Sequence, residues 1–225
     1  MRNKTITIIP ARGNSKRLPG KNTKFLGEIP LLAHSIKYAQ QFSFIDDIYV
    51  TTDNLEIKKV ALEFGAKVID RPKEISGDFE PTVSALKHVL ESLSETIENV
   101  ILLQPTNPLR PTNLLTEAFE LYLKSNSDSL FTVSRNHNKL GKIVSNKFEP
   151  FNYIIGQRSQ DLEPLFYENG LLYISKANLI KNDVIISENA LPLEVNHIFA
   201  EVDIDTQEDF DYAEYLYNKL IIHNK

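Results

Sequence analysis

Short, continuous apolar runs alternate along this chain with longer amphipathic segments, and this alternation constrains the fold more than any other feature. The runs are rich in Ile and Val, which is typical of strands buried on both faces of a parallel sheet. They are residues 5–10, 47–51, 67–69, 100–104 and 129–133. Helix-like segments separate them, at 30–41, 54–64, 81–93 and 112–124. Strands that alternate with helices predict an open α/β sheet whose ligands bind at the carboxyl ends of the strands.

The alternation breaks between Ser134 and Pro192, where polar residues and short possible strands prevail. We interpret this stretch, approximately 134–192, as an insertion that forms an arm against another subunit. The pattern returns with a predicted strand at 197–204 and a predicted amphipathic helix at 206–220. The 225 residues suit a single domain, 1–225, with this insertion inside it.

Composition excludes several classes of protein. The net charge is −5, which disfavours a general nucleic-acid binder. There is no cysteine, which excludes disulfides, thiol nucleophiles and Cys-ligated metals, and the five histidines lack the spacing of a zinc site. No apolar run approaches the roughly 18 residues of a membrane span, and the first residues lack the long apolar region of a secretory signal. The expected location is the cytoplasm, without a membrane partner.

A basic loop follows the first predicted strand, in an otherwise acidic chain. Four cations lie within ten residues, with small polar residues and two glycines between them: Ala11, Arg12, Gly13, Asn14, Ser15, Lys16, Arg17, Gly20, Lys21 and Asn22. Backbone N–H groups and cations at the carboxyl edge of a sheet suit a polyphosphate. The spacing fits neither a Walker A loop nor a dinucleotide-binding fingerprint. The alternative is a solvated basic turn.

Two carboxylates, Asp203 and Asp205, alternate with apolar residues near the end of the chain. Residues two apart on a strand share a face, so the carboxylates would converge and could hold a divalent ion such as Mg²⁺. The alternative is that Asp205 or Thr206 simply caps the final helix.

Polar residues also follow two inner strands. Gln104 emerges from the apolar run 100–104, where it suits a ligand hydroxyl or carboxylate, unless backbone groups satisfy it. Arg71-Pro72 follows the third predicted strand, and Thr82 lies near a helix start, where short hydroxyl residues more often serve as caps.

These motifs resemble the CMP-sialic acid synthetases (N-acylneuraminate cytidylyltransferases) and their relatives for legionaminic and pseudaminic acid. The resemblance rests on the basic loop 11–22, the string Gln104–Arg110, Arg71-Pro72 and the Asp203-x-Asp205 pair. It extends to 158–162 and 167–174. Two departures stand out: Asn107 replaces the usual Ser, and Tyr167-Glu168 replaces the Arg-Pro of many bacterial members.

The resemblance implies a Rossmann-like three-layer α/β/α nucleotidyltransferase fold, with a mainly parallel sheet and a small inserted dimerisation arm. It implies that CTP and a nine-carbon 2-keto sugar acid react with the help of Mg²⁺, in a homodimer. The implied nucleotide-binding residues are Ala11, Arg12, Gly13, Ser15, Lys16, Lys21, Asn22, Arg71 and Thr82. The implied sugar-binding residues are Gln104, Asn169, Tyr173, Lys142 and Arg158, the last two acting from the partner subunit. Asp203 and Asp205 would bind the metal and, with Arg12 and Lys21, form the catalytic set.

Purely structural roles are the alternative for some of these residues. Tyr173 could pack in the core, and Lys142 and Arg158 could be ordinary surface charges.

Two other functions also remain open. One is a cytidylyltransferase for Kdo (3-deoxy-manno-octulosonate), whose loop resembles Arg17–Lys21. The other is a nucleotide-binding module of the same fold without catalysis, against which the intact cations and Asp pair argue.

Overall fold

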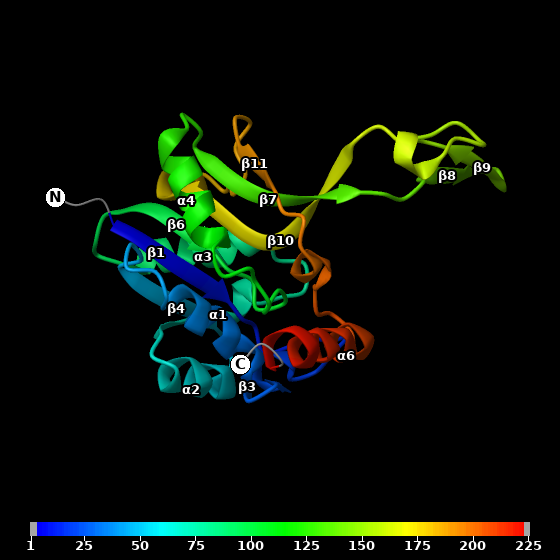
Figure 1. Cartoon of the computed structure of the whole chain (residues 1–225). Coiled ribbons are helices and arrows are strands. Elements are labelled where there is room, and N and C mark those ends of the chain that lie inside the picture. The colour runs from blue at the N-terminus through cyan, green and yellow to red at the C-terminus, as the bar shows by residue number, and fades with distance from the viewer. Residues whose placement is uncertain (1–3, 223–225) are drawn as a thin grey trace.

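A computed structural model describes residues 4–222, which form a seven-stranded sheet between two layers of helices (Figure 1). The strand order is β11-β7-β10-β6-β1-β4-β5. Within the group β6-β1-β4-β5 every pairing is parallel, and β11 is also parallel to β7. Strand β10 is antiparallel to both of its neighbours. The strands of this sheet are β1 Lys4–Pro10, β4 Asp47–Thr52, β5 Lys67–Asp70, β6 Ile97–Leu102, β7 Ser129–Asn136, β10 Leu165–Lys176 and β11 Leu191–Glu194.

Helices cover both faces of the sheet, because the helices of the strand–helix–strand crossovers pack on one face or the other. On one face, the core contains residues of α1 (Leu31–Ala39), α2 (Leu55–Glu63) and α4 (Leu114–Lys124). On the other face, it contains residues of α3 (Thr82–Ser92) and α5 (Ala177–Lys181). The predicted three-layer α/β fold with a mainly parallel sheet is confirmed.

Helix α6 (Gln207–Leu216) continues into a π-helix, Tyr217–Ile222, and packs on a third apolar cluster beside the sheet. This cluster includes Val202 and Ile204, which are almost completely buried, and Leu26 of the short strand β2 (Phe25–Leu26). Strand β2 pairs with β3 (Ile29–Pro30). The cluster therefore holds the chain on both sides of Asp203 against the body of the protein.

The five predicted strands and the helices that follow them are confirmed, with shifts of one to three residues at their ends. Asn54 caps α2, because its side chain accepts hydrogen bonds from the backbone N–H groups of Glu56 and Ile57. Helix α2 is followed by Gly65, at φ +83°. Within residues 4–222, no helix is long and apolar enough to cross a membrane.

An arm projects from the sheet between β7 and β10 (Figure 1). It carries the hairpin of β8 (Gly141–Val144) and β9 (Lys147–Pro150) and a 3₁₀ turn, Ser159–Asp161. The projecting part is shorter than the predicted insertion 134–192, because β10 and β11 belong to the central sheet. The predicted single domain, 1–225, extends at both ends beyond the described residues.

The predicted strand at 197–204 is wrong. Residues Ile198–Glu201 form a 3₁₀ helix, and Val202–Asp205 joins no sheet. The backbone N–H of Ile204 instead donates to the carbonyl of Thr106, at 2.8 Å. The apolar–polar alternation that suggested a strand arises because Val202 and Ile204 are buried in the third cluster while Asp203 stays exposed.

Candidate functional site

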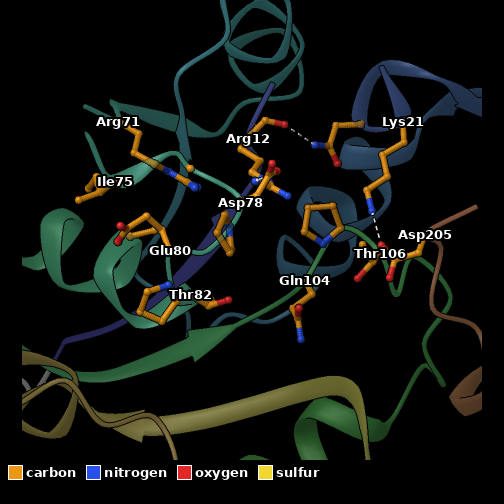
Figure 2. A pocket seen from close by; sticks show the side chains of 16 residues that line it. Arg12, Lys21, Arg71, Ile75, Asp78, Glu80, Thr82, Gln104, Thr106 and Asp205 are labelled. Atoms are coloured by element: carbon orange, nitrogen blue, oxygen red, sulfur yellow. Dashed lines mark hydrogen bonds and ion pairs between the residues drawn. The ribbon is translucent and has the colours of Figure 1, made fainter. Parts of the chain in front are cut away.

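A pocket of about 260 Å³ lies at the carboxyl edge of the parallel strands. The loops that follow β1, β5 and β6 line it, because the carboxyl ends of parallel strands meet at one edge. Figure 2 shows Arg71 and Thr82 at one end, Lys21, Thr106 and Asp205 at the other, and Arg12 and Asp78 between them. The pocket therefore has two chemically different ends, with a cation in each.

The basic loop after β1 places Lys21 at the start of a short 3₁₀ helix, Lys21–Thr23, behind Gly20 at φ +69°. The Lys21 side chain is 11% exposed. Its Nζ donates to a carboxylate oxygen of Asp205 at 2.9 Å and to the carbonyl of Ile204 at 2.8 Å (Figure 2). Arg17 also pairs with Asp205, at 2.5 Å. The loop and the chain before α6 are thus joined by ion pairs.

Asn22 supplies a buried acceptor in the pocket wall. Its Nδ2 donates to the carbonyl of Arg12 at 3.1 Å. Its Oδ1 is buried and has no hydrogen-bond partner among residues 4–222. A buried polar atom without a partner is costly, so this oxygen suits an N–H or O–H donor of a ligand.

Asp78 occupies the centre of the cation cluster. Its two carboxylate oxygens pair separately, with Arg12 at 2.6 Å and with Lys16 at 2.5 Å. Lys16 and then Arg12 hold the pKa of Asp78 below its usual range. A phosphate group in place of this carboxylate could pair with the same two cations.

Arg71 lies at the opposite end from Lys21 and is buried. Its Nη2 donates to the carbonyl of Thr51 at 2.7 Å, and its Nε donates to the Thr51 hydroxyl at 3.3 Å. Burial and the charge of Arg12 lower the pKa of Arg71 to about 10, against a weaker opposing effect of Asp53. It is therefore charged at neutral pH. Thr82, the first residue of α3, is exposed nearby.

Asp203 and Asp205 lie close together, so the charge of Asp205 acts on the Asp203 carboxyl group. Desolvation raises the pKa of Asp203, the negative charge of Asp205 adds to this, and a hydrogen bond with Thr106 opposes it. Among residues 4–222, no group of three or more His, Asp or Glu side chains is placed to hold a metal ion. Two hard carboxylates fit Mg²⁺, which commonly takes one or two protein carboxylates and completes its shell with waters and phosphate oxygens.

The alternative role of the Asp205 region as a helix cap is also present. The Thr206 hydroxyl accepts from the backbone N–H of Asp209, and the Asp209 carboxylate accepts from the backbone N–H of Thr206 at 2.8 Å. Because Thr206 and Asp209 cap the helix, the Asp205 carboxylate is left to face Lys21 and the pocket.

Gln104 lines the pocket, and its backbone carbonyl is held from behind by Arg110. Arg110 is buried, and its guanidinium donates to Gln104 O at 2.9 Å, to Leu171 O at 2.8 Å and to Ser35 Oγ at 3.0 Å. Burial lowers the pKa of Arg110 to about 10. Three hydrogen bonds from one rigid group fix the turn that presents Gln104.

Four loop residues that the sequence predicted as nucleotide-binding do not line the pocket: Ala11, Gly13, Ser15 and Lys16, of which Lys16 pairs with the pocket residue Asp78. Ala11 is buried, and its backbone N–H donates to Thr51 O. The backbone N–H of Gly13 donates to Asp53, and a Cβ there would meet Asn54 Cβ at 2.7 Å, so this glycine serves packing within the protein. Ser15 lines a small neighbouring cavity of about 30 Å³.

Two residues predicted to bind sugar face the protein interior instead. The Asn169 side chain is buried and bonds Thr132 at 2.6 Å and Ser134 at 2.9 Å. Tyr173 is buried in the sheet core, and its hydroxyl donates to Glu168 at 3.2 Å. Strand periodicity predicts alternate faces, but it does not say which face meets a ligand.

Lys142 and Arg158 lie on the arm, where both are exposed, and neither lines the pocket of its own chain. Arg158 forms a bidentate ion pair with Asp161.

Four residues of the site were not predicted from the sequence. Asp78, Glu80 and Thr106 line the pocket, and Arg110 supports it from behind. Thr106 and Arg110 lie within the string Gln104–Arg110, which was the available signal. Asp78 and Glu80 lie in a loop that carries no such signal.

Comparisons with known proteins agree on one family. A family model described as cytidylyltransferase matches residues 6–225. The chain is 35% identical to a CMP-N,N'-diacetyllegionaminic acid synthase of Legionella pneumophila, over 94% of this chain and 95% of that protein. It is 32% identical to a pseudaminic acid cytidylyltransferase of Campylobacter jejuni, over 95% and 96%. It is 34% identical to an N-acylneuraminate cytidylyltransferase of Streptococcus agalactiae, of which it spans 52%.

Solved structures with the same fold are more distant in sequence. A CMP:2-keto-3-deoxy-manno-octonic acid synthetase complexed with CTP has a TM-score of 0.74 at 18% identity, over 96% of this chain and 99% of that one. A 4-diphosphocytidyl-2C-methyl-D-erythritol synthase from Anaerococcus prevotii has a TM-score of 0.66 at 14% identity, over 96% and 97%. At these identities the likeness bears on the fold alone.

Proposed function

The chain belongs to the cytidylyltransferase family, as its motifs predicted, and from this premise we propose that it joins CMP from CTP to a nine-carbon 2-keto sugar acid of the sialic type. The anomeric hydroxyl of the sugar attacks the α-phosphorus of CTP, and the bond to pyrophosphate breaks. The proton of the hydroxyl is lost to solvent or a base. The observation that carries the proposal is the two-ended pocket, with Arg71 at one end and Lys21 paired with Asp205 at the other.

The triphosphate binds along the basic loop. Arg12 and Lys16 exchange Asp78 for phosphate oxygens, and Lys21 neutralises charge that develops as pyrophosphate leaves. Fixed cations that meet developing charge are effective because they need no reorganisation during the reaction. The chemistry asks for positioning and charge neutralisation rather than a covalent intermediate.

The cytidine lies toward Arg71 and Thr82. Asn22 Oδ1, buried and without a partner among the described residues, accepts a hydrogen bond from the bound nucleotide. Gln104, held in place by Arg110, faces the sugar acid from the end of β6.

Asp203 and Asp205 would hold Mg²⁺, which would supply Lewis acidity and a template for phosphate oxygens when bound. Asp205 also orients Lys21 through their ion pair. With two protein carboxylates available, the ion would take its remaining ligands from water and from CTP.

The proposed enzyme is a homodimer in which Lys142 and Arg158 serve the partner's site. Support comes from the arm, which projects from the sheet (Figure 1). The arm also exposes a set of large apolar side chains. These are Leu140, Ile143, Val144, Phe148, Phe151, Ile154 and Ile155. Apolar exposure of this extent is typical of an interaction surface.

The test is pyrophosphate release with CTP, Mg²⁺ and a panel of N-acetylneuraminic, legionaminic, pseudaminic, deaminoneuraminic and Kdo acids. We expect release with CTP and one or more nine-carbon acids, and none with UTP, ATP or without sugar. Release with Kdo alone would favour the second candidate, a Kdo cytidylyltransferase, whose loop resembles Arg17–Lys21. CTP binding without turnover of any acid would contradict the proposal.

A further inference from the structure

Asn107 lies behind the pocket rather than in it, where three separate segments of the chain meet. It is 1% exposed. Its Nδ2 donates to the carbonyl of Val202 at 2.8 Å and to the carbonyl of Asn169 at 3.2 Å. The side-chain amide of Asn107 thus donates to two backbone carbonyl groups that belong to segments far apart in the sequence.

The first of these carbonyls precedes Asp203 directly. The segment Val202–Asp205 joins no sheet, so its backbone depends on individual hydrogen bonds. Residues 106–107 supply two of them, from Asn107 to Val202 O and from Ile204 N–H to Thr106 O. Lys21 supplies a third, to Ile204 O. Loss of the Asn107 bond would leave a buried carbonyl without that partner and release the backbone before Asp203.

The second carbonyl belongs to an irregularity in β10. The register of β10 against β7 shifts between Glu168 and Tyr173, and Gly170 there has φ +75°. A Cβ at Gly170 would lie 2.8 Å from Asn107 Oδ1. Position 170 therefore needs glycine for two reasons: the left-handed backbone conformation favours it, and a Cβ atom would clash with the Asn107 side chain.

We infer that Asn107 is a positioning residue for the carboxylate pair, and that Asn169-Gly170 supports it rather than contacting the sugar. This inference rests on the proposed role of Asp203 and Asp205 as metal ligands. Asn107 sets the path of the backbone between the carboxylates and thereby the affinity for the divalent ion. Partners that orient metal ligands commonly change metal affinity by about 10- to 100-fold when removed.

The main test uses Asn107→Ser, which keeps one short donor, and measures Mn²⁺ binding by electron paramagnetic resonance with an α,β-methylene analogue of CTP. We expect roughly tenfold weaker Mn²⁺ binding. We also expect a matching rise in the Mg²⁺ concentration that gives half-maximal turnover, with little change in the KM for CTP at saturating metal. A merely structural role would lower the melting temperature and leave the metal dependence unchanged.

The matched control is Asn99→Ser on β6, the strand that precedes Asn107. Asn99 is 6% exposed and also makes two side-chain hydrogen bonds, but they join it to Thr5 and Tyr122 and not to the chain beside Asp203. We expect it to lower stability without weakening Mn²⁺ binding. A second variant, Gly170→Ala, reaches the same amide from β10 and is expected to weaken Mn²⁺ binding in the same direction.

The outcomes separate the inference from the function on which it rests. If the unaltered protein binds Mn²⁺ no better than Asp203→Asn does, the metal assignment itself fails and the inference falls with it. If Asp203→Asn abolishes binding but Asn107→Ser and Gly170→Ala bind Mn²⁺ as the Asn99→Ser control does, the inference is overturned and the metal assignment stands.

Discussion

The Lys21 side chain is largely buried in the pocket wall, and its two hydrogen bonds reach the chain around Asp205. Replacing it with Met keeps the apolar stem and removes the charge. We expect Lys21→Met to lower kcat by about 100-fold or more, because a fixed donor that meets developing charge contributes on that scale. The measurement is steady-state pyrophosphate release, with thermal melting to confirm folding.

Lys24→Met is the control for that variant. Lys24 follows the same 3₁₀ helix, but it donates to Gln207 and lies over the Phe210 ring, outside the pocket. If the two variants lose equal activity, or if Lys21→Met acts through stability alone, the catalytic role of Lys21 is contradicted.

Asp78 competes with the triphosphate for Arg12 and Lys16. The two ion pairs are exposed and therefore weak, so release of the two cations is expected to tighten CTP binding by roughly two- to fivefold in Asp78→Asn. Isothermal titration with CTP measures the change.

Glu80→Gln removes one negative charge from the same pocket without touching those two ion pairs. An equal gain in Glu80→Gln would indicate a general effect of charge. A loss of affinity in Asp78→Asn would mean instead that Asp78 holds the two cations ready for phosphate.

The hydrophobic pattern of the sequence and the position of residues after predicted strands identified some residues of the site but not others. Arg12, Lys21 and Gln104 were predictable because each follows a buried strand, and such positions share one edge of a parallel sheet. Asp78 was not, because its loop has no periodicity and its partners lie over 60 residues away. Asn169 and Tyr173 were assigned to the sugar, yet their side chains are satisfied inside the protein.

At the scale of elements, continuous apolar runs predicted the strands well, because a strand covered by helices on both faces must be apolar at every position. The prediction of a strand at 197–204 failed, because the alternation of apolar and polar residues there reflects only which side chains are buried. Val202 and Ile204 face the cluster under α6, so the pattern of a strand arises without a strand. Strand β10 is hard to predict as one strand, because its register against β7 shifts between Glu168 and Tyr173.

Helix α6 begins with a capping box that holds the chain next to the carboxylate pair. Partial burial would by itself raise the pKa of Asp209, but hydrogen bonds from the N–H groups of Asp205 and Thr206 and from the Thr206 hydroxyl lower it below its usual range. A lowered pKa in the folded state means that the ionised carboxylate stabilises the fold above its unfolded pKa of about 3.9. That stabilisation is lost as pH falls through the lower, folded pKa.

We therefore expect Asp209→Asn to cost about 1 kcal/mol at pH 7, a fall of roughly 2–4 °C in melting temperature. The difference from the unaltered protein should persist at pH 5 and shrink below about pH 4. Calorimetry over this range measures it. Asp211→Asn, further along α6, removes an acid outside the capping box, and an equal pH-dependent loss there would contradict the assignment.

At the scale of the whole molecule, the proposed active site is divided between two bodies, the sheet edge and the projecting arm. The pocket of one chain has Asp205 and Lys21 but neither Lys142 nor Arg158. If the arm serves the partner's site, two inactive variants should complement each other. The first variant is Asp205→Asn, and the second carries both Lys142→Ala and Arg158→Ala.

Mixed in equal amounts and allowed to exchange subunits, the two variants should regain roughly a quarter of the unaltered activity, because half of the dimers are mixed and each has one complete site. The readout is pyrophosphate release before and after exchange, with light scattering to confirm about twice the chain mass. The control mixes Asp205→Asn with Asp203→Asn, which lie in the same half of the site and cannot complement. Recovery in neither mixture, despite confirmed exchange, would mean that the arm does not act across the dimer.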